Sequence, residues 1–297
     1  MVEELGGVIT PLVTPLDKNE DLDVEGLVQL LRHVILGGVD GIFLHGTAGE
    51  FPLLNDQVFE ESIQITRKKV DEGLPVYVGV SAASTEKSIK RAKVAKDLGA
   101  DILVSTTPYY YDLSQEEIKK HFTIITNKVD APLLLYNIPD KTHNLITIDT
   151  LRDLAKNERI IGIKASNTDF GFFLRTLEVC NQESLYIFQG KEEAGALSLI
   201  AGADGAVMGM SNLVPNLASS IFEKVMQNKI ENALKIQNQV NQLTEMYNYG
   251  SWLPSIKQAL AEKNICKKFV KSPLSELTHK ERNKLKDFLK NSDLIKL

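Results

Sequence analysis

The sequence is poor in the features that mark secreted and membrane-bound proteins. Its 297 residues include only two cysteines, Cys180 and Cys266, and their wide separation argues against a disulfide framework. No apolar run approaches the roughly 18 residues that a membrane span needs. The first residues, Met1 to Glu4, lack the basic start of a signal peptide. We therefore expect a cytoplasmic protein that binds no membrane.

Signals for nucleic acids, metals and nucleotides are missing as well. A net charge of -5 argues against a nucleic acid partner, because such proteins concentrate positive charge. The five histidines show no paired ligand spacing with cysteines or acidic residues. The sequence contains neither a Gly-x-Gly-x-x-Gly turn nor a Gly-Lys-Ser/Thr loop. We therefore expect no metal site and no nucleotide site.

Short β-rich runs alternate with amphipathic stretches along most of the chain. Helix start signals lie at Asp23, at Asn55 and at Ser114, where Glu117 completes a capping box. Eight strand–helix units with apolar strands predict a parallel sheet that closes into a (β/α)8 TIM barrel, an α/β fold. The predicted strands cover residues 7–14, 41–45, 76–80, 101–106, 133–137, 160–164, 186–189 and 206–208.

Strand signals stop near Pro215, and helical patterns continue to the end of the chain. The lysines in this part alternate with acidic residues, which is typical of a solvated helix face rather than of a site for an anionic partner. We therefore expect a catalytic barrel over 1–225 and a C-terminal helical bundle over 226–297.

The predicted carboxyl ends of the strands are unusually polar. Thr47 follows the second strand, Tyr136 lies near the end of the fifth, and Lys164 closes the apolar run of the sixth. Because these ends converge on one face of a barrel, we expect the three side chains to meet near one point.

This set of side chains suits Schiff-base chemistry. An amine must lose its proton before it attacks a carbonyl, and an apolar strand tip favours the neutral form of Lys164. The phenol of Tyr136, held by the hydroxyl of Thr47, can carry protons to and from the new bond. The glycine-flanked turn 46–49 can present backbone N–H groups to a small carboxylate. The sequence therefore predicts a 2-keto acid substrate.

Several motifs resemble those of the dihydrodipicolinate synthase/N-acetylneuraminate lyase family. The resemblance implies a (β/α)8 barrel with a C-terminal helical bundle, usually a homotetramer. It further implies a class I aldolase that acts on pyruvate and an aldehyde, with no metal or organic cofactor. The motifs are Thr14-Pro15, Gly46-Thr47-Ala48-Gly49-Glu50, Thr107-Pro108-Tyr109-Tyr110, Tyr136-Asn137-Ile138-Pro139, Gly162-Ile163-Lys164 and Gly202-Ala203-Asp204-Gly205.

The resemblance also implies catalytic roles. Lys164 would form the Schiff base, and Tyr136 would relay the proton and assist cleavage or formation of the carbon–carbon bond. Thr47 would link Tyr136 to Tyr110, which in many members of the family reaches into the neighbouring subunit's site.

The turn that starts at Gly46 would hold the keto-acid carboxylate through the backbone of Thr47 and Ala48. Most members carry a second hydroxyl residue at the position of Ala48, so binding here depends more on backbone N–H groups. Synthases of the lysine pathway carry an arginine where this chain has Lys141 and a glycine where it has His143. Lysine keeps the charge but loses the bidentate fork, which weakens a synthase assignment.

The seventh strand leads into Gly190, Glu192 and Glu193, which resemble the acidic pair that sugar-acid lyases use to hold substrate hydroxyls. The alternative is that the two glutamates merely favour a helix N-terminus. Met208, at the end of the eighth predicted strand, is also expected to contact substrate. The motifs are most similar to those of the 2-keto-3-deoxygluconate aldolase branch.

Other functions stay open at this point. Within the family they are the synthase that condenses pyruvate with aspartate semialdehyde, and N-acetylneuraminate lyase. A phosphate-binding barrel would use the glycine-rich turns after strands seven and eight, but Glu192 and Glu193 would repel a phosphate. A catalytically silent keto-acid-binding barrel is favoured only if Ala48 has abolished binding, and the retention of Lys164 argues against it.

Overall fold

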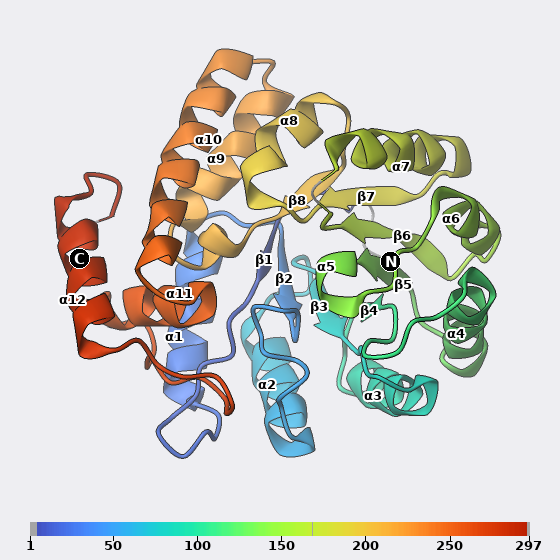
Figure 1. The fold of residues 1–297 in the computed structure, drawn as a ribbon, viewed down its shortest axis with the longest axis horizontal. Coiled ribbons are helices and arrows are strands. Elements are labelled where there is room, and N and C mark those ends of the chain that lie inside the picture. Colours follow the sequence, from blue (N-terminus) through green and yellow to red (C-terminus); the bar gives the residue numbers. More distant parts are fainter. Residues whose placement is uncertain (1–4, 168, 296–297) are drawn as a thin grey trace.

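The computed structural model describes residues 5–167 and 169–295. Within these residues, eight parallel strands pair in chain order and close into a barrel between β1 and β8 (Figure 1). The predicted TIM barrel is therefore confirmed. The strands are β1 (Gly7–Pro11), β2 (Gly41–Leu44), β3 (Val76–Gly79), β4 (Ile102–Thr106), β5 (Leu133–Asn137), β6 (Ile160–Ala165), β7 (Tyr186–Gln189) and β8 (Gly205–Val207).

The first strand is shorter than its sequence pattern predicts. Leu12 N still donates to Phe43 O of β2 at 2.9 Å, but Val13 N donates to the side-chain oxygen of Asn212 at 3.0 Å. A side chain thus replaces the neighbouring strand as the partner, and the backbone ladder ends.

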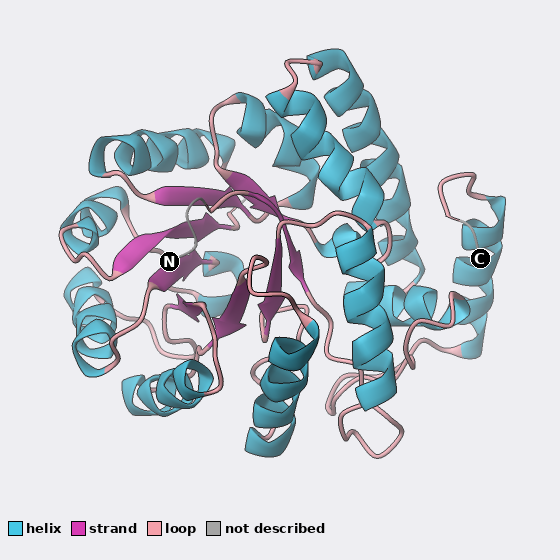
Figure 2. Cartoon of the chain, turned by 180° about the vertical axis from the view of Figure 1, so that it is seen from behind, coloured by secondary structure: helices cyan, strands magenta, loops and turns pink. Residues whose placement is uncertain are grey.

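Helices surround the barrel on its outer face (Figure 2). Asn55 caps its helix by accepting from Val58 N at 2.8 Å, and Ser114 and Glu117 form the predicted capping box. The helices are α1 (Val24–Leu36), α2 (Asp56–Lys69), α3 (Thr85–Asp97), α4 (Gln115–Lys128), α5 (Pro139–Thr142), α6 (Ile148–Ala155), α7 (Phe170–Glu183), α8 (Gly195–Ile200), α9 (Pro215–Met226), α10 (Ile230–Thr244), α11 (Trp252–Glu262) and α12 (His279–Asn291), with short 3₁₀ turns η1 (Glu192–Ala194), η2 (Gly209–Asn212) and η3 (Glu245–Tyr249).

Alternate residues of each strand face two different apolar layers. One layer fills the barrel interior and includes Phe43, Tyr136 and Val207, whereas the larger layer lies between the strands and the helices and includes Met208. Because strand side chains alternate in direction, neighbours in sequence belong to different layers. This alternation decides which strand-end residues reach the site.

The C-terminal helices α10, α11 and α12 lie along one side of the barrel, next to α1 and α9 (Figure 1). The predicted division after residue 225 falls at the end of α9, and it stays a prediction. Among the described residues, no helix is long and apolar enough to cross a membrane.

Candidate active site

A cavity of about 450 Å³ opens at the carboxyl ends of the strands. Its walls come from the ends of β5, β6, β7 and β8, the turn after β2, and the C-terminal helices. The lining residues are Pro11, Thr47, Ala48, Tyr136, Ile138, Asp140, Lys141, Lys164, Ser166, Gly190, Lys191, Glu192, Glu193, Val207, Gly209, Tyr247 and Trp252.

Lys164 lies at the floor of this cavity and is 4% exposed. Its strand β6 pairs in register with β5, which places Lys164 directly beside Tyr136. The Lys164 Nζ lies 4.0 Å from the centroid of the Tyr136 ring and 5.1 Å from that of Phe43. Aromatic rings therefore enclose the amine on the protein side and leave it facing the cavity.

Tyr136 is hydrogen-bonded to Thr47, with 3.3 Å between the phenol oxygen and the threonine Oγ1. Burial by itself raises the pKa of Tyr136, but the charge of Lys164 and the Thr47 hydrogen bond outweigh it, so the pKa lies below its ordinary value. A phenol that gives up its proton more readily is better suited to proton transfer near neutral pH.

The turn after β2 brings Thr47 and Ala48 to the cavity wall. Within the described chain, the backbone N–H groups of these two residues donate to no protein acceptor. They are available to an anionic ligand. Gly46 is buried beneath the turn, where a Cβ would lie 2.8 Å from the Phe43 ring. Gly46 therefore leaves room for the Phe43 ring and does not itself line the cavity.

Glu192 and Glu193 follow β7 and line the same cavity. Glu192 Oε2 accepts a hydrogen bond from Met210 N at 2.5 Å. Burial raises the pKa of the Glu192 carboxyl to about 7, a shift that the neighbouring Glu193 charge increases. Glu192 therefore changes charge near neutral pH.

Gly190, directly after β7, keeps the backbone close to Lys164. A Cβ on Gly190 would lie 1.9 Å from Ser166 Oγ and 2.9 Å from Lys164 Cε. Any side chain at this position would displace the lysine or the serine.

Three predicted site residues do not line this cavity in the described part of a single chain: Gly46, Met208 and Tyr110. Met208 points outward, and its sulfur lies 3.6 Å from where a Cβ on Gly195 of α8 would be, because strand alternation directs Val207 inward instead. Tyr110 is 81% exposed and packs edge-on against Tyr111, with 4.9 Å between ring centroids.

The structure adds cavity residues that the sequence motifs missed, among them Ser166, Lys191, Tyr247 and Trp252. Lys191 forms an ion pair with Asp140 at 3.2 Å, which joins the loop after β7 to α5. Tyr247 and Trp252 come from the C-terminal helices. No local pattern marks them, although Trp252 is the only tryptophan of the chain.

The described residues contain no cluster of histidine, cysteine and acidic side chains that could hold a metal ion. His45, which follows β2, is buried against Phe59, and its Nε2 lies 2.8 Å from Ser62 Oγ. Burial lowers the pKa of His45 to about 3, with the charge of Arg91 acting in the same direction, so this histidine is neutral at physiological pH.

Comparison with known proteins places this geometry in a family. The model of the dihydrodipicolinate synthetase family matches residues 4–292. A 4-hydroxy-tetrahydrodipicolinate synthase from Thermotoga neapolitana is 31% identical over 97% of this chain and 99% of its own length.

Two solved structures have closely similar folds. YagE, a prophage protein from E. coli K12 belonging to the dihydrodipicolinic acid synthase family, was solved in complex with pyruvate; it has a TM-score of 0.93 and 25% identity, covering 98% of this chain and 99% of its own. CdNal from Clostridium difficile, solved in complex with mannosamine, has a TM-score of 0.91 and 29% identity, covering 97% and 99%. This chain therefore belongs to the dihydrodipicolinate synthetase family and is a carbon–carbon lyase of the class I aldolase type.

Proposed function

We propose that this enzyme cleaves or forms a 2-keto-3-deoxy sugar acid, such as 2-keto-3-deoxygluconate, through a pyruvate Schiff base on Lys164. The observation that carries the proposal is the meeting of Lys164, Tyr136 and Thr47 in one cavity, with the Thr47 and Ala48 amides on its wall. No cofactor is needed, because the iminium that Lys164 forms with the keto carbon acts as the electron sink.

In the cleavage direction, the Lys164 amine attacks the keto carbon, and the turn amides hold the adjacent carboxylate. The attack turns the keto oxygen into a hydroxyl group. Tyr136 gives a proton to this hydroxyl, so water departs and the iminium forms. Tyr136 then takes the proton from the C4 hydroxyl, the C3–C4 bond breaks, and its electron pair moves to the iminium nitrogen to give an enamine and an aldehyde. Protonation of the enamine carbon and hydrolysis release pyruvate and restore Lys164.

The polar groups around the lysine favour a hydroxylated substrate. Ser166 is buried beside Lys164, and its hydroxyl lines the cavity. Glu192 and Glu193 add carboxylate acceptors to the same cavity. A polyol chain supplies the hydroxyl groups that such acceptors bind, whereas an apolar chain would leave them unpaired.

The second candidate is the condensation of pyruvate with aspartate semialdehyde. The Thermotoga neapolitana relative carries the name of that synthase, and Lys141 lines the cavity where it could meet a second carboxylate. A lysine binds a carboxylate as a point charge without the bidentate geometry of arginine, so we rank this activity below sugar-acid cleavage. N-acetylneuraminate lyase activity is a third possibility, in view of the resemblance to CdNal.

Borohydride trapping tests the Schiff base. The protein is incubated with pyruvate, reduced, and analysed by mass spectrometry for an adduct at Lys164. The Lys164→Arg variant is the matched control, because arginine keeps the charge but forms no stable imine. Absence of an adduct at Lys164 in the unmodified protein would overturn the proposal.

A substrate panel separates the branches of the family. It contains 2-keto-3-deoxygluconate, N-acetylneuraminate, and pyruvate with aspartate semialdehyde. We expect the highest kcat/KM with 2-keto-3-deoxygluconate. A clear preference for the semialdehyde reaction would instead assign the synthase activity.

A further inference from the structure

Among the described residues, one ion pair has both side chains completely buried and takes no part in the mechanism above. The side chains of Glu50 and Lys257 are each 0% exposed, and the Lys257 ammonium donates a hydrogen bond to Glu50 Oε1. Glu50 follows the turn after β2, whereas Lys257 lies in α11, 207 residues later. Removing two charges from water is costly, so such a pair persists only where its remaining hydrogen-bonding groups are also satisfied.

Both charges have a further hydrogen bond to the backbone. Lys257 Nζ also donates to Phe269 O at 2.7 Å, and Glu50 Oε2 accepts from Lys271 N at 2.6 Å. A single carboxylate of the barrel therefore ties together α11 and the segment that follows it. These contacts give Glu50 one fixed position relative to the C-terminal helices.

The backbone of Glu50 holds the turn that faces the cavity. Glu50 lies in the left-handed region with φ of 61°, and its N–H donates to Thr47 O at 3.2 Å. The preceding residue, Gly49, accepts from the Thr14 hydroxyl at 2.7 Å. Any shift of Glu50 is consequently passed to Thr47 through a direct hydrogen bond.

Helix α11 itself belongs to the cavity wall, because its first residue, Trp252, lines it. The buried pair thus connects two walls of one cavity that come from opposite ends of the sequence. The chain after α9, here called the C-terminal extension, also contacts the barrel away from this cavity, for example at the N-terminus of α1.

We infer that the Glu50–Lys257 pair positions the Thr47–Ala48 turn so that its amides bind the keto-acid carboxylate. The C-terminal extension then contributes directly to substrate binding in the barrel. Neither residue lines the cavity, so both are positioning residues. The inference rests on the proposed pyruvate site.

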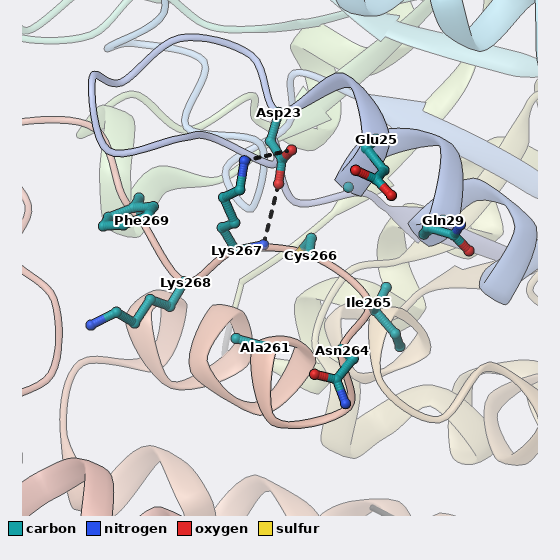
Figure 3. A pocket seen from close by; sticks show the side chains of 11 residues that line it. Asp23, Glu25, Gln29, Ala261, Asn264, Ile265, Cys266, Lys267, Lys268 and Phe269 are labelled. Atoms are coloured by element: carbon teal, nitrogen blue, oxygen red, sulfur yellow. Dashed lines mark hydrogen bonds and ion pairs between the residues drawn. The ribbon is translucent and has the colours of Figure 1, made fainter.

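A second ion pair between the extension and the barrel, whose lysine side chain is 54% exposed, provides a control for the loss of a contact away from the turn. Lys267 Nζ lies 3.1 Å from Asp23 Oδ1, and the Lys267 backbone N–H also donates to this carboxylate at 3.4 Å (Figure 3). This pair borders a separate cavity of about 430 Å³ that shares no lining residue with the catalytic one. Losing it weakens the docking of the extension without touching the turn.

Four variants of the full-length chain separate positioning from stability: Glu50→Gln, Lys257→Met, the double variant, and the control Lys267→Met. Glutamine offers one acceptor oxygen where the carboxylate offers two, so it cannot satisfy both Lys257 and Lys271. The double variant removes both charges and leaves no unpaired ion, so it is the variant best able to fold. The measurements are the pyruvate concentration that gives half-maximal borohydride trapping at Lys164, the adduct level at saturating pyruvate, and the melting temperature.

We expect the half-saturating pyruvate concentration to rise by about tenfold to a hundredfold in Glu50→Gln and Lys257→Met, since displacement of a binding group by about 1 Å has effects of this size. The adduct level at saturation is expected to stay near that of the unmodified protein. The double variant should regain melting temperature but not pyruvate affinity. Lys267→Met should keep wild-type affinity.

The outcomes that overturn the inference are distinct. Unchanged half-saturation in Glu50→Gln, recovery of affinity in the double variant, or an equal loss in Lys267→Met would each show that the pair only stabilises the fold. If the single variants do not fold, the half-saturating pyruvate concentrations of the double variant and of Lys267→Met are sufficient to test the inference. Absence of any adduct in the unmodified protein would instead contradict the proposed function.

Discussion

The side chain of Tyr136 has two roles next to Lys164. Its ring packs against the amine, and its phenol hydroxyl is placed to transfer protons during the reaction. The ring face lies 4.0 Å from the lysine nitrogen, and the hydroxyl is oriented by Thr47. Two different parts of one side chain therefore perform two tasks. A substitution that keeps the ring and removes the hydroxyl separates them.

We expect Tyr136→Phe to lower kcat by about 10²- to 10⁴-fold, the usual contribution of a positioned proton carrier. Lys164 keeps its packing against the ring, so the melting temperature should change little. The control is Tyr77→Phe, because Tyr77 is also buried in the barrel interior and its hydroxyl has no partner among the described residues. Steady-state kinetics of both variants check this expectation; equal rates for the two would refute the role of Tyr136.

We expect Glu192 to make substrate binding depend on pH. Its pKa is raised to about 7, so the group is a neutral acid below that pH and a carboxylate above it. Only the carboxylate accepts hydrogen bonds through both oxygens, so KM for a sugar acid should fall as the pH rises through about 7. KM measured across this range is the test.

The Glu192→Gln variant is the control for that pH profile. Glutamine does not titrate, so its KM should lose the step near pH 7 while Schiff-base trapping with pyruvate persists. A step that survives in this variant would assign the titration to another group.

At the scale of elements, a local repeat closes the end of the barrel opposite the active site. Three glycines in the left-handed region, Gly38, Gly99 and Gly202, each precede an aspartate by two positions. The aspartates are Asp40, Asp101 and Asp204, which accept from the backbone N–H groups of Val8, Val76 and Ile187 at 2.7 to 2.8 Å. Each carboxylate thereby joins the loop before β2, β4 or β8 to the strand before it in the sheet.

We expect Asp40→Ala to destabilise the protein by about 1–3 kcal/mol, because Val8 N would lose its acceptor in a buried position. The substitution lies far from the cavity, so kcat/KM should be unchanged at temperatures where the variant is folded. Thermal or urea unfolding measures the effect. Asp130→Ala is the control, since Asp130 forms only an exposed ion pair with Arg159, and it should change stability by less than about 1 kcal/mol.

At the scale of the whole molecule, the cavity depends on parts that the barrel alone does not contain. Tyr247 and Trp252 come from the C-terminal extension, and the Glu50–Lys257 pair connects that extension to the carboxylate turn. Tyr110, in contrast, is 81% exposed and does not line the cavity of its own chain. Its predicted role therefore requires a second copy, as in the homotetramer that the sequence resemblance implies.

Subunit mixing tests that role. We expect Tyr110→Ala and Lys164→Arg each to lose most activity, because one lacks the aromatic group and the other lacks the nucleophile. Co-refolded or co-expressed mixtures should regain part of the activity, since a Tyr110→Ala site can receive Tyr110 from its neighbour. Sedimentation velocity gives the size of the assembly, and a monomer with full activity would exclude the shared site.

Local sequence patterns were enough to predict the barrel and the site residues Lys164, Tyr136 and Thr47. These patterns involve only residues that are close together in the chain, so they can be recognised in the sequence. They include the strand runs, cap residues such as Ser114 and the motif around Lys164. The same reasoning extended the first strand too far, because the Asn212 side chain that replaces the strand partner lies 199 residues away from Val13. The prediction that Met208 contacts substrate was wrong for a related reason. The sequence showed where the eighth strand ends, but not which of its alternating side chains face the barrel interior.

By itself, the sequence determined the fold class, the family and the strand ends that carry Lys164, Tyr136 and Thr47, because alternating patterns and short motifs are local properties. Only the tertiary structure decided which neighbouring side chains face the cavity, how the extension closes its wall, and that Glu50 meets Lys257. The physical reason is that these contacts join residues far apart in the chain, where barrel closure and helix packing set the distances and no sequence period records them.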